Sequence, residues 1–200
     1  MKKAYYTLGL LPVLLFLWIS VSYQNPSFQK FDQYFSDLLY GREWLIFFHY
    51  IGETIFVIIV TVCLMLFLWL RERNYRAMLF VVFSIAGGTA VNQILKRIYQ
   101  RPRPEIEMQL DSYSFPSGHS MMGIIYLFTV AFIVNELIAS KSKRVIIWIV
   151  ATILFLLIGM SRVAESRHFS TDVLGGWSLG LFWFTLCVIW YKWRENYFKK

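Results

Sequence analysis

The sequence predicts an all-α membrane protein, built as a bundle of six transmembrane helices, from three observations. Hydrophobic residues make up 58% of the 200 residues and charged residues only 16%, whereas charged residues are about 25% of a typical soluble domain. Six apolar stretches approach the roughly 20 residues that a helix needs to cross a bilayer. Short connectors between several of them make consecutive helices antiparallel neighbours. We therefore expect one domain over residues 1–200.

The six predicted spans are each bounded by charged or turn residues. They are Ala4–Ser22, Thr54–Leu70, Ala77–Leu95, Gly118–Leu137, Val145–Met160 and Val173–Tyr191. The first stretch could instead be a signal peptide, because Lys2 and Lys3 precede it and small residues end it. Its apolar run is longer than the about 7–15 residues of the apolar region in a signal peptide, which favours an uncleaved helix. Residues 23–51 mix aromatic and charged residues and are expected at the membrane interface.

The basic residues predict the orientation of the helices. The segments on the side of the two termini hold 12 of the 20 lysines and arginines. Because basic residues favour the cytoplasmic side, both termini are predicted to be cytoplasmic. The net charge of +8 could also indicate nucleic-acid binding. The basic residues come in short clusters between apolar runs, however, which suits lipid head groups and topology signals, so no nucleic-acid partner is expected.

Three polar clusters lie in or beside the connectors on the side opposite the termini. They are Lys96 followed after six residues by Arg103-Pro104, then Pro116-Ser117-Gly118-His119, and then Ser161-Arg162 followed by His168 and Asp172. Each cluster alone has an ordinary explanation as a basic loop, a helix cap or a hydrogen-bonded pair. Together, on one face of the membrane, they supply the complementary parts of one reaction and favour an active site.

A phosphate group is the natural ligand for these residues. Lys96, Arg103 and Arg162 are three cations that repel one another unless an anion lies between them, and arginine holds phosphate oxygens in pairs. Residues 116–119 read as a helix start, and the free N–H groups of a helix start bind anions. A metal site would need several carboxylates or histidines, so no metal or cofactor is expected.

The two histidines are expected to divide the chemistry between them. Asp172 lies four residues after His168, so on a helical turn it can accept a hydrogen bond from the imidazole. This bond fixes the tautomer and leaves the other nitrogen free to attack phosphorus. His119 has no carboxylate at comparable spacing and is expected to protonate the leaving oxygen. His49 is interpreted as a structural histidine, and the remaining acids near the site as solvated loop charges: Glu105, Glu107, Asp111 and Glu165.

The three clusters resemble the three-part motif of the type 2 phosphatidic acid phosphatases. The patterns are Lys-x6-Arg-Pro, Pro-Ser-Gly-His and Ser-Arg-x5-His-x3-Asp, and the resemblance covers a catalytic core from about Ala77 to Tyr191. Arg101-Pro102 offers a competing register, but only Arg103-Pro104 keeps the gap from Lys96. The resemblance implies a six-helix membrane fold, His168 as nucleophile, His119 as acid and Asp172 as the residue that orients His168. It also implies that phosphate is held by Lys96, Arg103, Ser117, Gly118 and Arg162.

The function implied is that of a metal-independent phosphatase, which hydrolyses a membrane lipid phosphate monoester or diphosphate through a phosphohistidine. The small form resembles bacterial members of the family that act on phosphatidylglycerophosphate, the expected substrate, or on undecaprenyl diphosphate, the alternative. We expect the site to face the extracytoplasmic side of a bacterial cell membrane. A haloperoxidase is disfavoured by the six spans. A small transporter is disfavoured because its polar groups would lie near the bilayer midplane.

Overall fold

Helices are the regular elements throughout residues 2–198, the part of the chain that the structure, a computed structural model, describes. Side chains are described for residues 9–71 and 73–194. The elements are α1 (Lys2–Ser22), α2 (Pro26–Leu39), α3 (Glu43–Ile46), α4 (His49–Gly52), α5 (Thr54–Glu72), α6 (Tyr75–Val82), the π-helical turn η1 (Phe83–Gly87), α7 (Gly88–Tyr99), α8 (Gly118–Leu137), α9 (Lys141–Ala164) and α10 (Ser170–Phe198).

Five helical stretches among the described residues are long and apolar enough to cross a membrane, and they contain the whole of the second to sixth predicted spans. They are Thr54–Arg71, Tyr75–Tyr99, Gly118–Leu137, Lys141–Ala164 and Ser170–Arg194. The first predicted span lies in α1, whose described part Gly9–Ser22 is a shorter apolar helix. The predicted all-α membrane fold is therefore confirmed. Five of the six predicted spans are full-length apolar helices, and α1, a shorter apolar helix in its described part, takes the position of the first.

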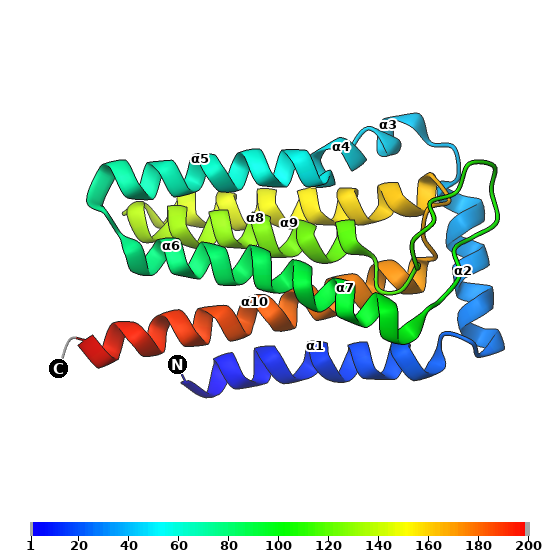
Figure 1. The fold of residues 1–200 in the computed structure, drawn as a ribbon, viewed down its shortest axis with the longest axis horizontal. Helices are drawn as coiled ribbons and strands as arrows, with labels where there is room; N and C mark the ends of the chain where they lie inside the picture. Colours follow the sequence, from blue (N-terminus) through cyan, green and yellow to red (C-terminus); the bar gives the residue numbers. More distant parts are fainter. Residues whose placement is uncertain (1, 199–200) are drawn as a thin grey trace.

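Helix α5 has the smallest buried fraction of the five long apolar stretches. It runs along the outer edge in Figure 1, and few of its residues are buried. Its exposed side chains include Ile55, Ile58 and Val62. Such a surface is unfavourable in water by about 25 cal/mol per Å², but it faces hydrocarbon in a bilayer. The ends of α5, where it joins α4 and approaches α6, therefore do most to fix its position.

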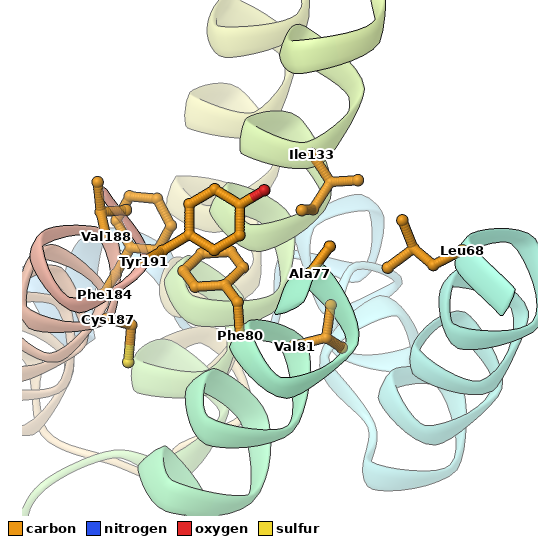
Figure 2. Packing of buried hydrophobic residues seen from close by; sticks show 9 residues of the cluster. All are labelled: Leu68, Ala77, Phe80, Val81, Ile133, Phe184, Cys187, Val188 and Tyr191. Atoms are coloured by element: carbon orange, nitrogen blue, oxygen red, sulfur yellow. The ribbon is translucent and has the colours of Figure 1, made fainter. Parts of the chain in front are cut away.

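A cluster of buried side chains joins α5, α6, α8 and α10 at the end of the bundle that holds the end of α10 (Figure 2). Phe80 is its centre, with no exposed surface. The ring centroid of Phe80 lies 5.1 Å from that of Tyr191 on α10 and 5.1 Å from that of Phe132 on α8. These tilted aromatic contacts fix the long helices against one another at this end.

At the other end, α8 and α10 approach closely because α10 carries glycines on the contact face. A Cβ atom added at Gly176 would lie 2.6 Å from the backbone oxygen of Ser117. Helices in lipid associate largely by such close packing of small residues, since lipid removes the hydrophobic drive. The contact brings the start of α8 against the first turns of α10.

The polar segments gather at one end of the bundle. In Figure 1 the start of α1 and the end of α10 lie at the left, while α2, α3, α4 and the loop between α7 and α8 lie at the right. Helix α2 runs across this end and contacts α9 and α10. All three polar clusters of the sequence therefore meet at the end opposite the termini.

Candidate active site

His168 lies in the short connector between α9 and α10 and is 3% exposed. Its Nε2 lies 3.2 Å from Arg103 Nη1, and its Nδ1 lies 3.4 Å from Asp172 Oδ2. A guanidinium can only donate hydrogen bonds, so Nε2 accepts and the ring proton belongs on Nδ1. This network assigns the tautomer in which the lone pair is on Nε2 and Nδ1–H faces Asp172.

Asp172 is completely buried and is held on both oxygens. Oδ2 accepts hydrogen bonds from the Phe169 N–H at 2.9 Å and from the Ser114 hydroxyl. Oδ1 accepts from Arg101 Nη1 at 2.7 Å. The contact with the His168 ring is long for a hydrogen bond, because Oδ2 already has two closer donors. Asp172 therefore fixes the turn that carries His168 as well as facing its ring.

Arg101 was missed as a site residue. The sequence suggested it only as a competing register for Arg103, and the structure uses both arginines. Arg101 is buried between Asp172 and Asp32 of α2, with Nη2 3.0 Å from Asp32 Oδ2. Its guanidinium lies over the rings of Tyr23 and Phe169, at 4.5 and 4.2 Å from their centroids. The polar cluster thus ties α2 to the start of α10.

The three predicted phosphate-binding cations come together beside His168, and each is fixed by a protein oxygen. Lys96 Nζ donates to the Tyr113 carbonyl at 2.5 Å, and Arg162 Nη1 donates to Glu165 Oε2 at 2.6 Å. Arg103 Nη1 donates to a backbone carbonyl as well as contacting His168. Burial, together with the nearby charge of Arg162, lowers the pKa of Arg103 to about 10.

The cations are left with unmatched positive charge. Lys96 is close enough to Arg103 and Arg162 to be repelled by both. Within the described residues Lys96 and Arg103 form no ion pair of their own, because Asp172 is paired with Arg101 and Glu165 with Arg162. The buried Nε of Arg162 also has no hydrogen-bond partner within the described residues. The arrangement is suited to an anion with several oxygens, such as phosphate.

Ser117 forms the cap of α8, as its position before the helix predicts. Its Oγ accepts from Ser120 N at 3.4 Å and from Ser120 Oγ at 2.9 Å, and its N–H donates to the Asp172 carbonyl at 3.0 Å. The first bond within the helix runs from Met121 N to Ser117 O. The N–H groups of Gly118 and His119 precede that bond and are the ones free for an anion. Contact of Ser117 itself with phosphate stays a prediction.

His119 has a carboxylate partner that local spacing did not reveal. Its Nε2 lies 3.4 Å from Oε1 of Glu53, the residue between α4 and α5. His119 also lies close enough to His168 for the two rings to interact electrostatically. The two histidines therefore belong to one site, and each faces an acid.

Glu165 is not the solvated loop charge that the sequence suggested. It bridges Arg162 and His49, whose Nδ1 lies 2.5 Å from Glu165 Oε1. The bridge is buried enough to persist, since Glu165 is 14% exposed and His49 18%. His49 thus links the α3–α4 segment to the end of α9. The other three acids of that prediction, Glu105, Glu107 and Asp111, are exposed.

Each of the two histidines lines a cavity beside the site. A cavity of about 630 Å³ between α2 and residues 101–105 reaches His168. A second cavity, of about 460 Å³, is lined by His119, Glu53 and Arg162 among others. A molecule whose phosphate lies between the histidines can therefore extend to either side.

The chain belongs to the PAP2 superfamily, whose family model matches residues 77–196. The match contains all three polar clusters, so the resemblance seen in the sequence is confirmed. With its five long apolar helices, the chain is a multi-pass membrane enzyme that hydrolyses phosphoric esters.

Individual relatives agree with this class. The chain is 29% identical over 182 residues to phosphatidylglycerophosphatase B of Bacillus subtilis, covering 86% of this chain and 89% of the relative. It is 26% identical over 195 residues to an undecaprenyl-diphosphatase of Sulfolobus acidocaldarius, covering 90% and 88%. A crystal structure of a transmembrane PAP2-type phosphatidylglycerolphosphate phosphatase from Bacillus subtilis matches with a TM-score of 0.82 and 27% identity, over 91% of this chain and 94% of that one.

Proposed function

We propose that this enzyme is a metal-independent lipid phosphatase that transfers a phosphoryl group first to His168 and then to water. The observation that carries the proposal is the geometry of His168, whose Nε2 lies 3.2 Å from Arg103 Nη1 while its Nδ1 faces Asp172. Burial, the largest effect, lowers the pKa of His168 to about 3, opposed by Asp172 and reinforced by Arg103 and Lys96. The ring is therefore neutral near pH 7, and its Nε2 holds the lone pair that a nucleophile needs.

In the first step, Nε2 of His168 attacks phosphorus and the bond to the lipid oxygen breaks. The electron pair goes to that oxygen, which takes a proton from His119. Arg103 exchanges its contact with Nε2 for one with a phosphate oxygen. Lys96 and Arg162, with the N–H groups at the start of α8, stabilise the charge on the equatorial oxygens.

In the second step, water gives a proton to His119 and its oxygen attacks phosphorus. The phosphorus–nitrogen bond breaks, and its electron pair returns to Nε2 of His168. The three cations, which repel one another, also disfavour a bound divalent metal there, which supports a reaction without metal. Phosphate leaves, and both histidines regain their starting protonation states.

We propose phosphatidylglycerophosphate as the substrate and phosphatidylglycerol as the product. The similarity to the Bacillus subtilis phosphatase supports this choice. Undecaprenyl diphosphate is the second candidate, supported by the similarity to the Sulfolobus enzyme and by three cations that suit an anion of higher charge. The cavity beside His119 gives space for the part of either lipid next to the leaving oxygen.

We also propose that both termini are cytoplasmic and that the site faces the extracytoplasmic side of a bacterial cell membrane. The excess of basic residues on the side of the termini supports this orientation. The position of the polar clusters, at the opposite end of the bundle from the start of α1, agrees with it (Figure 1).

Turnover of three lipids in detergent tests the proposal: phosphatidylglycerophosphate, phosphatidic acid and undecaprenyl diphosphate, each with excess EDTA. We expect the first to have the highest kcat/KM, EDTA to leave the rate unchanged, and vanadate to inhibit as a five-coordinate mimic of phosphorus. A His168→Ala preparation gives the background. Activity lost with EDTA and restored by magnesium would contradict the mechanism, and a preference for undecaprenyl diphosphate would favour the second candidate.

A further inference from the structure

We infer that Glu53 is the positioning residue of His119, so that the site contains a second carboxylate–histidine pair opposite His168 and Asp172. The inference rests on the proposed function, because it assigns Glu53 a part in the proton transfer to the leaving oxygen. It deepens that function by adding a residue outside the three polar clusters and outside the span of residues 77–196 that matches the family.

The backbone around Glu53 is built against the ring of His119. Helix α4 packs on α8 and α9 and ends at the buried Gly52. A Cβ atom added at Gly52 would lie 2.7 Å from Ile158 Cγ2 and 3.0 Å from His119 Cδ2. A larger residue would thus displace the ring or the chain. The residue that follows this contact is Glu53, which places its carboxylate beside the edge of the same ring.

The Glu53 side chain turns toward His119 and not toward its own helix. Glu53 holds the position before α5 where a side chain commonly caps the helix, and it makes no such bond. Instead Oε1 lies 3.4 Å from His119 Nε2. The carboxylate is 46% exposed and the histidine 21%, and both line the cavity of about 460 Å³. Glu53 therefore acts where the leaving part of a lipid substrate would lie.

Among the charged groups around His119, Glu53 is the one placed to stabilise the protonated ring. His119 faces the cationic groups of Arg162 and Lys96 and the rings of His168 and His49. The other carboxylate nearby, that of Glu165, is held by Arg162 at 2.6 Å and by His49 at 2.5 Å. An imidazolium at position 119 is repelled by its cationic neighbours, and the negative charge of Glu53 offsets that repulsion.

The pair also selects which nitrogen donates the proton. A carboxylate only accepts hydrogen bonds, so Nε2 of His119 carries a proton toward Glu53. The Nδ1–H of the imidazolium is then the donor to the leaving oxygen as the phosphorus–oxygen bond breaks. The neutral ring keeps Nε2–H on Glu53 and later accepts the proton of water at Nδ1. Glu53 keeps its charge through the cycle and touches no reacting atom.

Comparing two substrates tests the inference. The Glu53→Gln variant keeps the shape but removes the charge, and Glu136→Gln is the matched control. Glu136 is 41% exposed and pairs with Lys192 at 3.0 Å, on a helix end away from the site. For a lipid phosphate, Glu53→Gln should lower kcat by about 10–100-fold with little change in KM, part of the about 10²–10⁴-fold that general-acid catalysis gives. For p-nitrophenyl phosphate, whose leaving group needs less protonation, kcat should fall much less.

An equal loss with both substrates, or an unchanged rate with the lipid, would overturn the inference. The Glu53→Asp variant keeps the charge and should recover part of the lipid rate. If Glu53→Gln does not fold, Glu53→Asp serves as the test by itself. Its shorter side chain moves the carboxylate away from His119, so kcat should fall for the lipid phosphate and much less for p-nitrophenyl phosphate. Trapping the phosphoenzyme in the unaltered protein distinguishes a failure of the proposed function from a failure of the Glu53 assignment. If no label forms on His168, the proposed function fails, whereas a normal label with an unaffected Glu53→Gln variant rejects only the assignment of Glu53.

Discussion

At the scale of single residues, two arginines two positions apart have different environments. Arg103 lies in the loop between α7 and α8 and is partly exposed. It contacts His168, the proposed nucleophile, and lines the cavity that reaches His168. Arg101 is 7% exposed and lies between two buried carboxylates. Both Asp32 and Asp172 depend on it: burial raises the pKa of Asp32, while hydrogen bonds from Thr171 and the charge of Arg101 oppose that rise.

Removing Arg101 should therefore damage stability as well as activity. In Arg101→Met, two buried carboxylates lose their shared cation, and breaking a buried pair costs about 3–5 kcal/mol. We expect a clearly lower unfolding temperature in detergent and a loss of turnover, because Asp172 holds the turn that carries His168. Arg97→Met, at an exposed position on α7, is the control and should change neither. An Arg101→Met protein as stable as the control would show that the ion pairs of Arg101 with Asp32 and Asp172 do not stabilise the fold.

Spacing along the sequence predicted one of the three carboxylate–histidine pairs among the described residues. His168 and Asp172 are four residues apart, and the structure brings them together on one turn. His49 and Glu53 have the same spacing, but each pairs with a distant residue, His49 with Glu165 and Glu53 with His119. Those partners come from other helices, 66 residues away in the case of Glu53 and His119. Local geometry cannot reveal such pairs, because they depend on how α4 packs against α8 and α9.

At the scale of elements, the helices extend beyond the apolar runs that predicted them. The third span was predicted to end at Leu95 and the fifth at Met160, because charged residues follow. The helices continue to Tyr99 and Ala164. Lys96 and Arg162 therefore project from the last turns of helices, where packing fixes their direction. Hydropathy locates a membrane span but not the polar helical turn that continues it. The π-helical turn η1 within the third span does not change the hydropathy, so hydropathy did not predict it.

The contact between α8 and α10 sets the distance between the phosphate cradle and Asp172. Gly176→Ala would place a methyl 2.6 Å from Ser117 O and 3.2 Å from Met121 N, both backbone atoms. Overpacking of this kind costs about 1–3 kcal/mol, so we expect lower turnover and a lower unfolding temperature. Gly123→Ala is the matched control, since its methyl meets Ile158 at 3.5 Å. Equal behaviour of the two variants would contradict this role for the contact.

At the scale of the whole molecule, the polar chemistry lies at one end of an apolar bundle. Composition and six apolar runs predicted this architecture, because a bilayer imposes lengths and backbone pairing that few other environments impose. The folding of residues 23–51 into α2, α3 and α4 over the site did not follow from composition. Those helices are held by polar contacts such as that of Asp32 with Arg101, whose partners lie far apart in the sequence.

The orientation of the bundle can be tested by labelling single cysteines. Met108, in the loop between α7 and α8, is 92% exposed, and Lys143 near the start of α9 is exposed at the opposite end. In a Cys63→Ser background, Met108→Cys should react with an impermeant maleimide on intact cells. Lys143→Cys should react only after permeabilisation. The reverse pattern would place the site on the cytoplasmic side.

The phosphorylated intermediate is the central claim, and rapid-quench trapping tests it most directly. With a substrate carrying radiolabelled phosphate, the unaltered protein should show label on a histidine within one turnover. His119→Ala should still form the label from an activated ester such as p-nitrophenyl phosphate, whose leaving group needs little help. His168→Ala should form none with either substrate. Label that persists in His168→Ala would contradict the assignment of the nucleophile and, with it, the mechanism.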